Sequence, residues 1–165
     1  MSVQLTTDPD PARSGVGAVT VSTWRVGTPA RQRATVEAIS RAWRARAWPD
    51  AGLLSYSVAV GEDGDTLLHY AQWSGEAAYE RFAAASRDER VAEIDAAVPG
   101  IERVDGTRVL NYAEWESARA HIDALAAPGE GVGFATAEWA RVRAYTGVRG
   151  STVTRYTPAI SLSAG

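Results

Sequence analysis

Three stretches of the chain alternate apolar residues with small or polar ones, which is the two-residue period of a β-strand. Residues 18–26 are rich in β-branched side chains, Leu54 to Val60 alternate with small residues, and Leu67 to Trp73 follow the dipeptide Asp63-Gly64. Asp-Gly between two such stretches is a strong signal for a tight hairpin. The pattern therefore predicts one strand and, later in the chain, an antiparallel hairpin of two more.

Two other stretches have the helical period. Thr28 and Pro29 are typical of an N-cap and a first helical position, and apolar residues recur at helical spacing as far as residue 46. A second helix is predicted from Ser74, as its N-cap, to the Pro99-Gly100 stop, with a break near residues 86–88. The apolar stripe of this second helix contains Tyr79, Phe82, Val91, Ile94 and Val98.

A further strand is expected at Ile101, so the order is strand, helix, strand, strand, helix, strand. This order is typical of the ferredoxin-like split βαβ arrangement, an α+β fold with an antiparallel sheet and two helices on one face. The other face of such a sheet would expose a large apolar surface, which a second sheet has to cover. We therefore expect a homodimer that forms an α+β barrel, although the C-terminal part of the chain could supply strands instead.

An internal repeat divides the chain. The segment from Leu68 to Trp73, LHYAQW, returns at residues 110–115 as LNYAEW, each time after a Gly-containing turn and before a helical stretch. We predict a flexible tail over residues 1–14, a complete unit over 15–105 and a partial second repeat over 106–165. The partial repeat is expected to end with a short helix near 137–145 and a strand near 151–156.

The composition of the chain excludes several classes of function. Charged residues make up 22% of the chain, the net charge is −3, and no basic block suggests binding to nucleic acid. No apolar run approaches the ~20 residues that a membrane span needs, and no secretory signal is visible, so a cytoplasmic protein is expected. The absence of cysteine and lysine, with only two histidines, excludes thiolate metal sites, a Schiff-base lysine and a three-histidine zinc site.

The third predicted strand carries the candidate chemistry. Because alternate residues of a strand share a face, Leu67, His69, Ala71 and Trp73 point the same way. They form a wall for a planar ring, with an imidazole that titrates near ~6.5 and could take a phenolic proton. Tyr79, early in the following helix, could donate a hydrogen bond to a developing oxyanion. The alternative is structural: the tryptophan fills the core, and the histidine and tyrosine only support packing.

The chain also resembles the antibiotic biosynthesis monooxygenase family, a branch of the dimeric α+β barrel superfamily. The resemblance is carried by TWRVGTPARQRATVEAI, WPDAGLLSYSVAVGEDGDTLLHYAQW, EAAYERF and ERVAEIDAAVPGIE, which together span about residues 15–104. VLNYAEWESARAHIDAL and STVTRYTPAISLSAG look like the back half of a second unit. The resemblance implies oxidation of phenolic polyketides to quinones by O2, with no bound cofactor and no metal.

The functional pattern of that family is Asn-x-x-x-Trp on the third strand, a Tyr six residues after the Trp, and an Arg on the second helix. The first copy in this chain has Trp73 and Tyr79 at the matching positions and His69 in place of the Asn, with Arg87 or Arg90 as loose matches to the Arg. We expect His69, Trp73 and Tyr79 to be the catalytic residues. The second copy has Asn111 and Trp115, with His121 in place of the Tyr, and His121 is expected to be a surface residue. The residues expected to bind substrate are Leu67, Ala71, Asn111, Trp115 and Arg90.

Two functions remain open at this point. The first is a cofactor-independent monooxygenase whose partners are a small aromatic substrate and O2. The second is a non-oxygenating protein of the same fold, either a cyclase-like polyketide tailoring enzyme or a small-molecule-binding protein.

Overall fold

The computed structural model describes residues 3–5, 10–49, 52–104, 116–126, 140–141, 144 and 154–164. The chain divides into two units, one from residues 1–106 and 156–165 and the other from residues 107–155. The first unit contains the sheet and its helices.

The sheet of the first unit is antiparallel throughout. β2 (Ala18–Arg25), β3 (Leu53–Gly61), β4 (Thr66–Trp73) and β5 (Glu102–Val104) lie in the order β5-β2-β4-β3. This is the strand order of the ferredoxin-like fold, so the predicted α+β class and the predicted strands are confirmed. The hairpin between β3 and β4 turns at Gly64, whose φ of 70° favours glycine, and the Asp63 carboxylate accepts the backbone N–H of Asp65 and of Thr66.

Two further strands extend the sheet beyond β3. β6 (Tyr156–Ala164) pairs along β3, and β1 (Val3–Leu5) pairs with β6, both antiparallel. The prediction of a flexible tail over residues 1–14 is therefore wrong for Val3–Leu5, and the last strand lies later than the predicted 151–156. Pairing of this kind satisfies the unpaired N–H and C=O groups of a long edge strand, which no local sequence pattern records.

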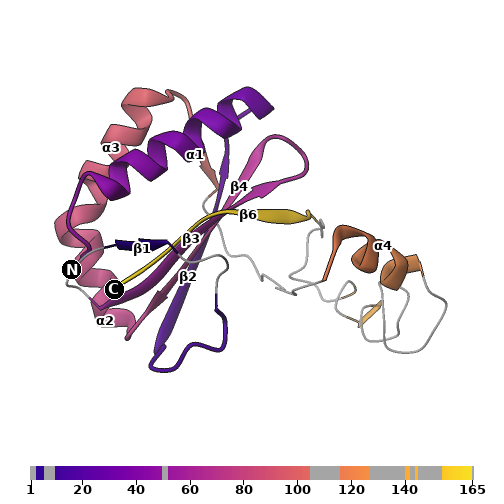
Figure 1. Ribbon diagram of the computed structural model, residues 1–165, viewed down its shortest axis with the longest axis horizontal. Coiled ribbons are helices and arrows are strands. Elements are labelled where there is room, and N and C mark those ends of the chain that lie inside the picture. The colour runs from indigo at the N-terminus through magenta and orange to yellow at the C-terminus, as the bar shows by residue number, and fades with distance from the viewer. Residues whose placement is uncertain are drawn as a thin grey trace. The chain divides into compact units, whose positions relative to one another are not determined.

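Three helices and one π-helical turn cover one face of the sheet, called here the inner face (Figure 1). α1 (Pro29–Arg44) begins as predicted, with the Thr28 side chain accepting the backbone N–H of Arg31 at 3.2 Å. α2 (Glu76–Phe82), the turn η1 (Ala83–Arg87) and α3 (Asp88–Ala97) follow one another directly. The expected break is thus a π-helical turn, and the N-cap of α2 is Gly75 instead of Ser74, whose backbone N–H is bonded to the carbonyl of Gly52.

The core lies between the inner face and these helices. Trp73, Leu67, Val58 and Leu162 project from the sheet and are almost fully buried, as is Ile39 from α1. Burying a side chain of this size stabilises the fold by about 1.5–3 kcal/mol relative to leaving it exposed. The apolar stripes read from the sequence are therefore the faces that pack together.

The opposite face of the sheet is less apolar than expected. Apart from Leu68, its buried positions on β3, β4 and β6 are polar: Ser57 and Ser161 share a hydrogen bond of 2.9 Å, and the Ser55 hydroxyl donates to Gln72 at 2.6 Å. Large apolar side chains are exposed there on β2, at Val19 and Val21. The homodimer and its barrel remain predictions, and among the described residues the large apolar side chains exposed on this face belong to β2.

The second unit contains α4 (Ala118–Ala126). Its first turn is capped by Ser117, whose hydroxyl accepts the backbone N–H of Ala120 at 3.0 Å, and Arg119 pairs with Asp123 one turn later. The helical stretch predicted after Trp115 is confirmed, whereas most of the helix predicted at 137–145 lies outside the described residues. None of the helices in the described ranges combines the length and the hydropathy required to traverse a bilayer.

Candidate active site

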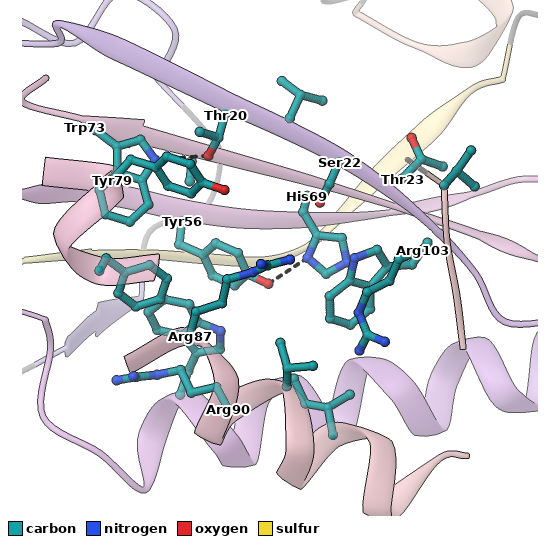
Figure 2. Close-up of a pocket in the computed structure, with 18 residues that line it drawn as sticks. Thr20, Ser22, Thr23, Tyr56, His69, Trp73, Tyr79, Arg87, Arg90 and Arg103 are labelled. Atoms are coloured by element: carbon teal, nitrogen blue, oxygen red, sulfur yellow. Dashed lines mark hydrogen bonds between the residues drawn. The ribbon is translucent and has the colours of Figure 1, made fainter. Parts of the chain in front are cut away.

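A pocket of about 170 Å³ lies between the inner face of the sheet and the turn formed by α2, η1 and α3. β2, β3 and β4 supply its floor, and the helices supply its roof, as Figure 2 shows. Its size is close to that of the ~150 Å³ engineered cavity that binds benzene. The pocket therefore has room for an aromatic ring, and part of it is open to solvent.

Six Trp, Tyr and Phe side chains line the pocket among the described residues. Trp43 stacks on Tyr56 with ring centroids 4.3 Å apart and an angle of 22° between the rings, and it also stacks on Phe82. Trp73 meets Tyr79 edge to face at 5.4 Å. Such packing fixes the rings in place and presents flat apolar surfaces to a planar ligand.

Trp73 is held by a hydrogen bond as well as by packing. Its indole N–H donates to the hydroxyl of Thr20 across the β2–β4 pair at 3.0 Å, and only 2% of its surface is exposed. A buried indole N–H that lacked a partner would cost about 1–3 kcal/mol. Figure 2 shows the hydroxyl of Tyr79 pointing into the pocket beside this pair.

His69 and Tyr56 form a hydrogen-bonded pair at the centre of the floor. The Tyr56 hydroxyl lies 2.7 Å from His69 Nδ1, and the indole of Trp24 lies against the imidazole with centroids 4.0 Å apart. His69 Nε2 has no hydrogen-bond partner among the described residues. Neutral His and Tyr side chains carry two polar protons between them, so one remains available when the other forms their mutual bond.

The environment of this pair keeps both groups neutral. Burial, together with the positive charge of Arg103, lowers the pKa of His69 from 6.5 to about 3. Burial also raises the pKa of Tyr56 above its usual 10. This lowered pKa differs from the expectation that His69 titrates near neutral pH, and it makes the neutral imidazole a weak base. The role of His69 as a general base stays a prediction.

Three arginines reach the pocket from the helical side and from β5. Arg90 is 5% exposed, donates to the carbonyls of Ser86 and Ala47, and lies over the Trp43 ring at 4.8 Å. Arg103 pairs with Asp95 at 2.8 Å and covers Trp24 at 4.4 Å. Arg87 is exposed and extends into the pocket in Figure 2.

The guanidinium of Arg90 is a fixed buried cation. Burial, with the charge of Arg46, lowers the pKa of Arg90 from 12.5. Its Nε–H is buried and has no partner among the described residues. A buried cation with an unused donor favours an anionic or electron-rich ligand.

The structure brings most of the predicted site residues together. His69, Ala71, Trp73, Tyr79, Arg87 and Arg90 all line the pocket. Leu67, predicted to bind substrate, does not line it, because it is fully buried in the core. Asn111 and Trp115 lie outside the described residues, and His121 is half-buried on α4 in the other unit.

Sequence reasoning missed Tyr56, Thr20 and Arg103. Tyr56 shares its strand face with Val58 and Val60, and this alternation could have placed it beside His69 on the neighbouring strand. Thr20 and Arg103 gave no local signal. The role of Thr20 depends on the pairing of β2 with β4, and that of Arg103 depends on the short strand β5. No group of three or more metal-ligating side chains that could hold an ion occurs within the described ranges.

No family model matches the sequence, and no curated protein matches it. Among solved structures, the chain is similar to a monooxygenase from the gene ActVA-Orf6 of Streptomyces coelicolor, crystallised in complex with the ligand nanaomycin D. The two are 29% identical over 61% of this chain and 96% of the other, with a TM-score of 0.45.

Proposed function

We propose that this protein is a cofactor-independent monooxygenase that oxidises a phenolic aromatic compound, such as an aromatic polyketide, to a quinone with O2. The reaction class follows from the sequence resemblance over about residues 15–104, in which Trp73 and Tyr79 match the functional pattern and His69 stands in place of its Asn. The observation that supports it is the pocket, in which rigid aromatic walls, a neutral His69–Tyr56 pair and the buried Arg90 cation face the same space.

The reaction balances without an external reductant. A phenol with a free para position has the net conversion ArOH + O2 to quinone + H2O: the ring loses four electrons, one oxygen atom enters the new carbonyl, and the other leaves as water. The substrate itself supplies every electron that O2 accepts. The protein has to bind the phenol, favour its ionised form and exclude competing reactions.

Arginine charge is the means by which this pocket would favour the phenolate. A cation within about 4–6 Å lowers the pKa of an acidic group by about 1–3 units. Arg90 is held by two carbonyls and two aromatic rings, so its charge is in place before the substrate binds. The proton leaves to water on the open side of the pocket, and the phenolate then donates an electron to O2.

The His69–Tyr56 pair would orient the substrate oxygen. Since the pair is neutral, it offers one hydrogen-bond donor to an oxygen atom in the pocket and does not compete with the substrate for its proton. Trp73 and Tyr79 would contact the face and the edge of the substrate's aromatic ring. This assigns to the histidine a positioning role in place of the general base that the sequence suggested.

The second function, ligand binding or tailoring without oxygen transfer, is favoured by one observation. Burial lowers the pKa of the lining histidine to about 3, which makes it a weak base, and ligand binding alone needs no base. This reading requires the same pocket and the same ligand class, so only turnover separates the two.

Oxygen consumption separates them. With a hydroxylated anthrone in buffer freed of metals by chelating resin, we expect the protein to consume one O2 for each quinone formed, above the rate of spontaneous oxidation. Heat-denatured protein is the control. Tight binding of the anthrone without added oxygen uptake would contradict the proposed function and support the binding protein.

A further inference from the structure

The lining of the pocket has an unbalanced charge. Arg87, Arg90 and Arg103 contribute three guanidinium groups, and no Asp or Glu lines the pocket in the described part of the chain. The carboxylate of Asp95 partly offsets Arg103 through their 2.8 Å contact. A pocket with apolar walls strengthens the field of the remaining charges, so it attracts anions.

The three arginines differ in what already occupies them. Arg90 is bonded to two backbone carbonyls and lies over two rings, and Arg103 is bonded to Asp95. Arg87 makes no hydrogen bond or ion pair with any described residue, and it is exposed at the edge of the pocket. It is thus the one lining guanidinium, within the described ranges, whose full set of donors is available to a ligand.

Local structure directs Arg87 to this place. It is the last residue of η1, a π-helical turn composed otherwise of Ala83, Ala84, Ala85 and Ser86. π-Helical turns widen a helix by one residue and occur frequently at functional sites. The small residues before Arg87 leave its side chain free of neighbours on its own turn, and Figure 2 shows the side chain directed into the pocket.

We propose that the substrate carries a carboxylate in addition to its phenol, and that Arg87 binds this carboxylate at the edge of the pocket. The inference rests on the proposed function for the identity of the phenol and adds the second functional group. Arg90, which is buried, would still stabilise the phenolate.

A carboxylate fits better than a phosphate ester. The guanidinium plane matches the two oxygens of a carboxylate in a fork, and one unoccupied arginine matches one negative charge. A phosphate site usually adds backbone N–H groups from a glycine-rich loop or a helix N-terminus, whereas no glycine occurs among the described lining residues. The geometry therefore selects a monoanionic, planar acceptor.

Calorimetric titration under nitrogen tests the inference without turnover. The probes are 6-hydroxy-2-naphthoate, its neutral amide 6-hydroxy-2-naphthamide, and 2-naphthyl phosphate. We expect the naphthoate to bind at least about tenfold more tightly than the amide, since a charge-assisted bond of this kind at an exposed arginine lies at the low end of the usual range. The preference should shrink as salt rises.

Arg87→Gln should remove the preference for the carboxylate while the amide binds as before. The matched control is Arg81→Gln, which deletes an exposed arginine of α2 that does not line the pocket and should leave the preference intact. The melting temperature of each variant verifies its fold.

Any other pattern of binding overturns the inference. Equal binding of acid and amide by the unmodified protein, loss of the preference in Arg81→Gln as much as in Arg87→Gln, or no binding of any probe would refute it. Tighter binding of 2-naphthyl phosphate than of the naphthoate would refute the carboxylate. A carboxylate preference without oxygen uptake refutes only the proposed function, and oxygen uptake without the preference refutes only this inference.

Discussion

Trp73→Ala is expected to lower the free energy of unfolding by about 3–5 kcal/mol, the usual cost of truncating a large buried aromatic side chain. Trp73 is 2% exposed and contacts Tyr79 and Phe82 from the helical layer. Its removal would leave a cavity beneath α2 and leave the Thr20 hydroxyl without its indole partner. The midpoint and slope of urea denaturation measure the change.

Trp73→Phe separates packing from hydrogen bonding. This variant keeps a ring in the same space and loses the indole N–H, so we expect a cost of about 1 kcal/mol from the lost bond plus a smaller packing deficit. An alanine variant no less stable than the phenylalanine variant would show that the tryptophan side chain is not part of the core. That result would also remove the rigid wall on which the proposed site depends.

His69→Gln is expected to abolish a large acid-dependent loss of stability. The folded-state pKa of His69 is about 3 and its usual value is 6.5, so the unfolded state binds a proton first as the pH falls. The stability of the unmodified protein is complete above about pH 6.5 and decreases from there to about pH 3. Since one pKa unit is worth about 1.4 kcal/mol, the decrease attributable to this residue amounts to several kcal/mol.

Denaturation curves at a series of pH values test this expectation. Glutamine cannot titrate and can still accept a hydrogen bond from Tyr56, so the difference between the variant and the unmodified protein isolates the histidine. The control is His121→Gln, which removes the other histidine, on α4 in the second unit, and should keep the acid-dependent loss. If His69→Gln loses stability with acid as steeply as the unmodified protein, His69 is not held neutral by burial.

Local patterns predicted the central part of the fold well. The alternation along residues 18–26, 54–60 and 67–73 and the Thr28-Pro29 start are properties of neighbouring residues, and the structure places strands and a helix there. β1 and the position of β6 were missed, because each forms through pairing with a segment far away in the sequence. Strand register of that kind has no local signature.

The sequence predicted which residues form the candidate site better than it predicted the chemistry of those residues. Strand period placed His69, Ala71 and Trp73 on one face, and all three line the pocket. The same period could not show that helices would cover this face and depress the pKa of His69, since burial depends on the packing of α1, α2 and α3. The predicted titration of His69 near neutral pH therefore missed the effect of burial, and Tyr56 was overlooked as its hydrogen-bond partner.

The origin of the oxygen atom in the product tests the central claim most directly. The protein would be incubated with a hydroxylated anthrone under ¹⁸O2 in metal-free buffer, and the quinone examined by mass spectrometry. The account predicts one ¹⁸O atom in each enzymatically formed quinone, at a rate above the spontaneous background. Quinone formed in ¹⁸O2 with its new oxygen derived from water, or no protein-dependent quinone at all, would contradict it.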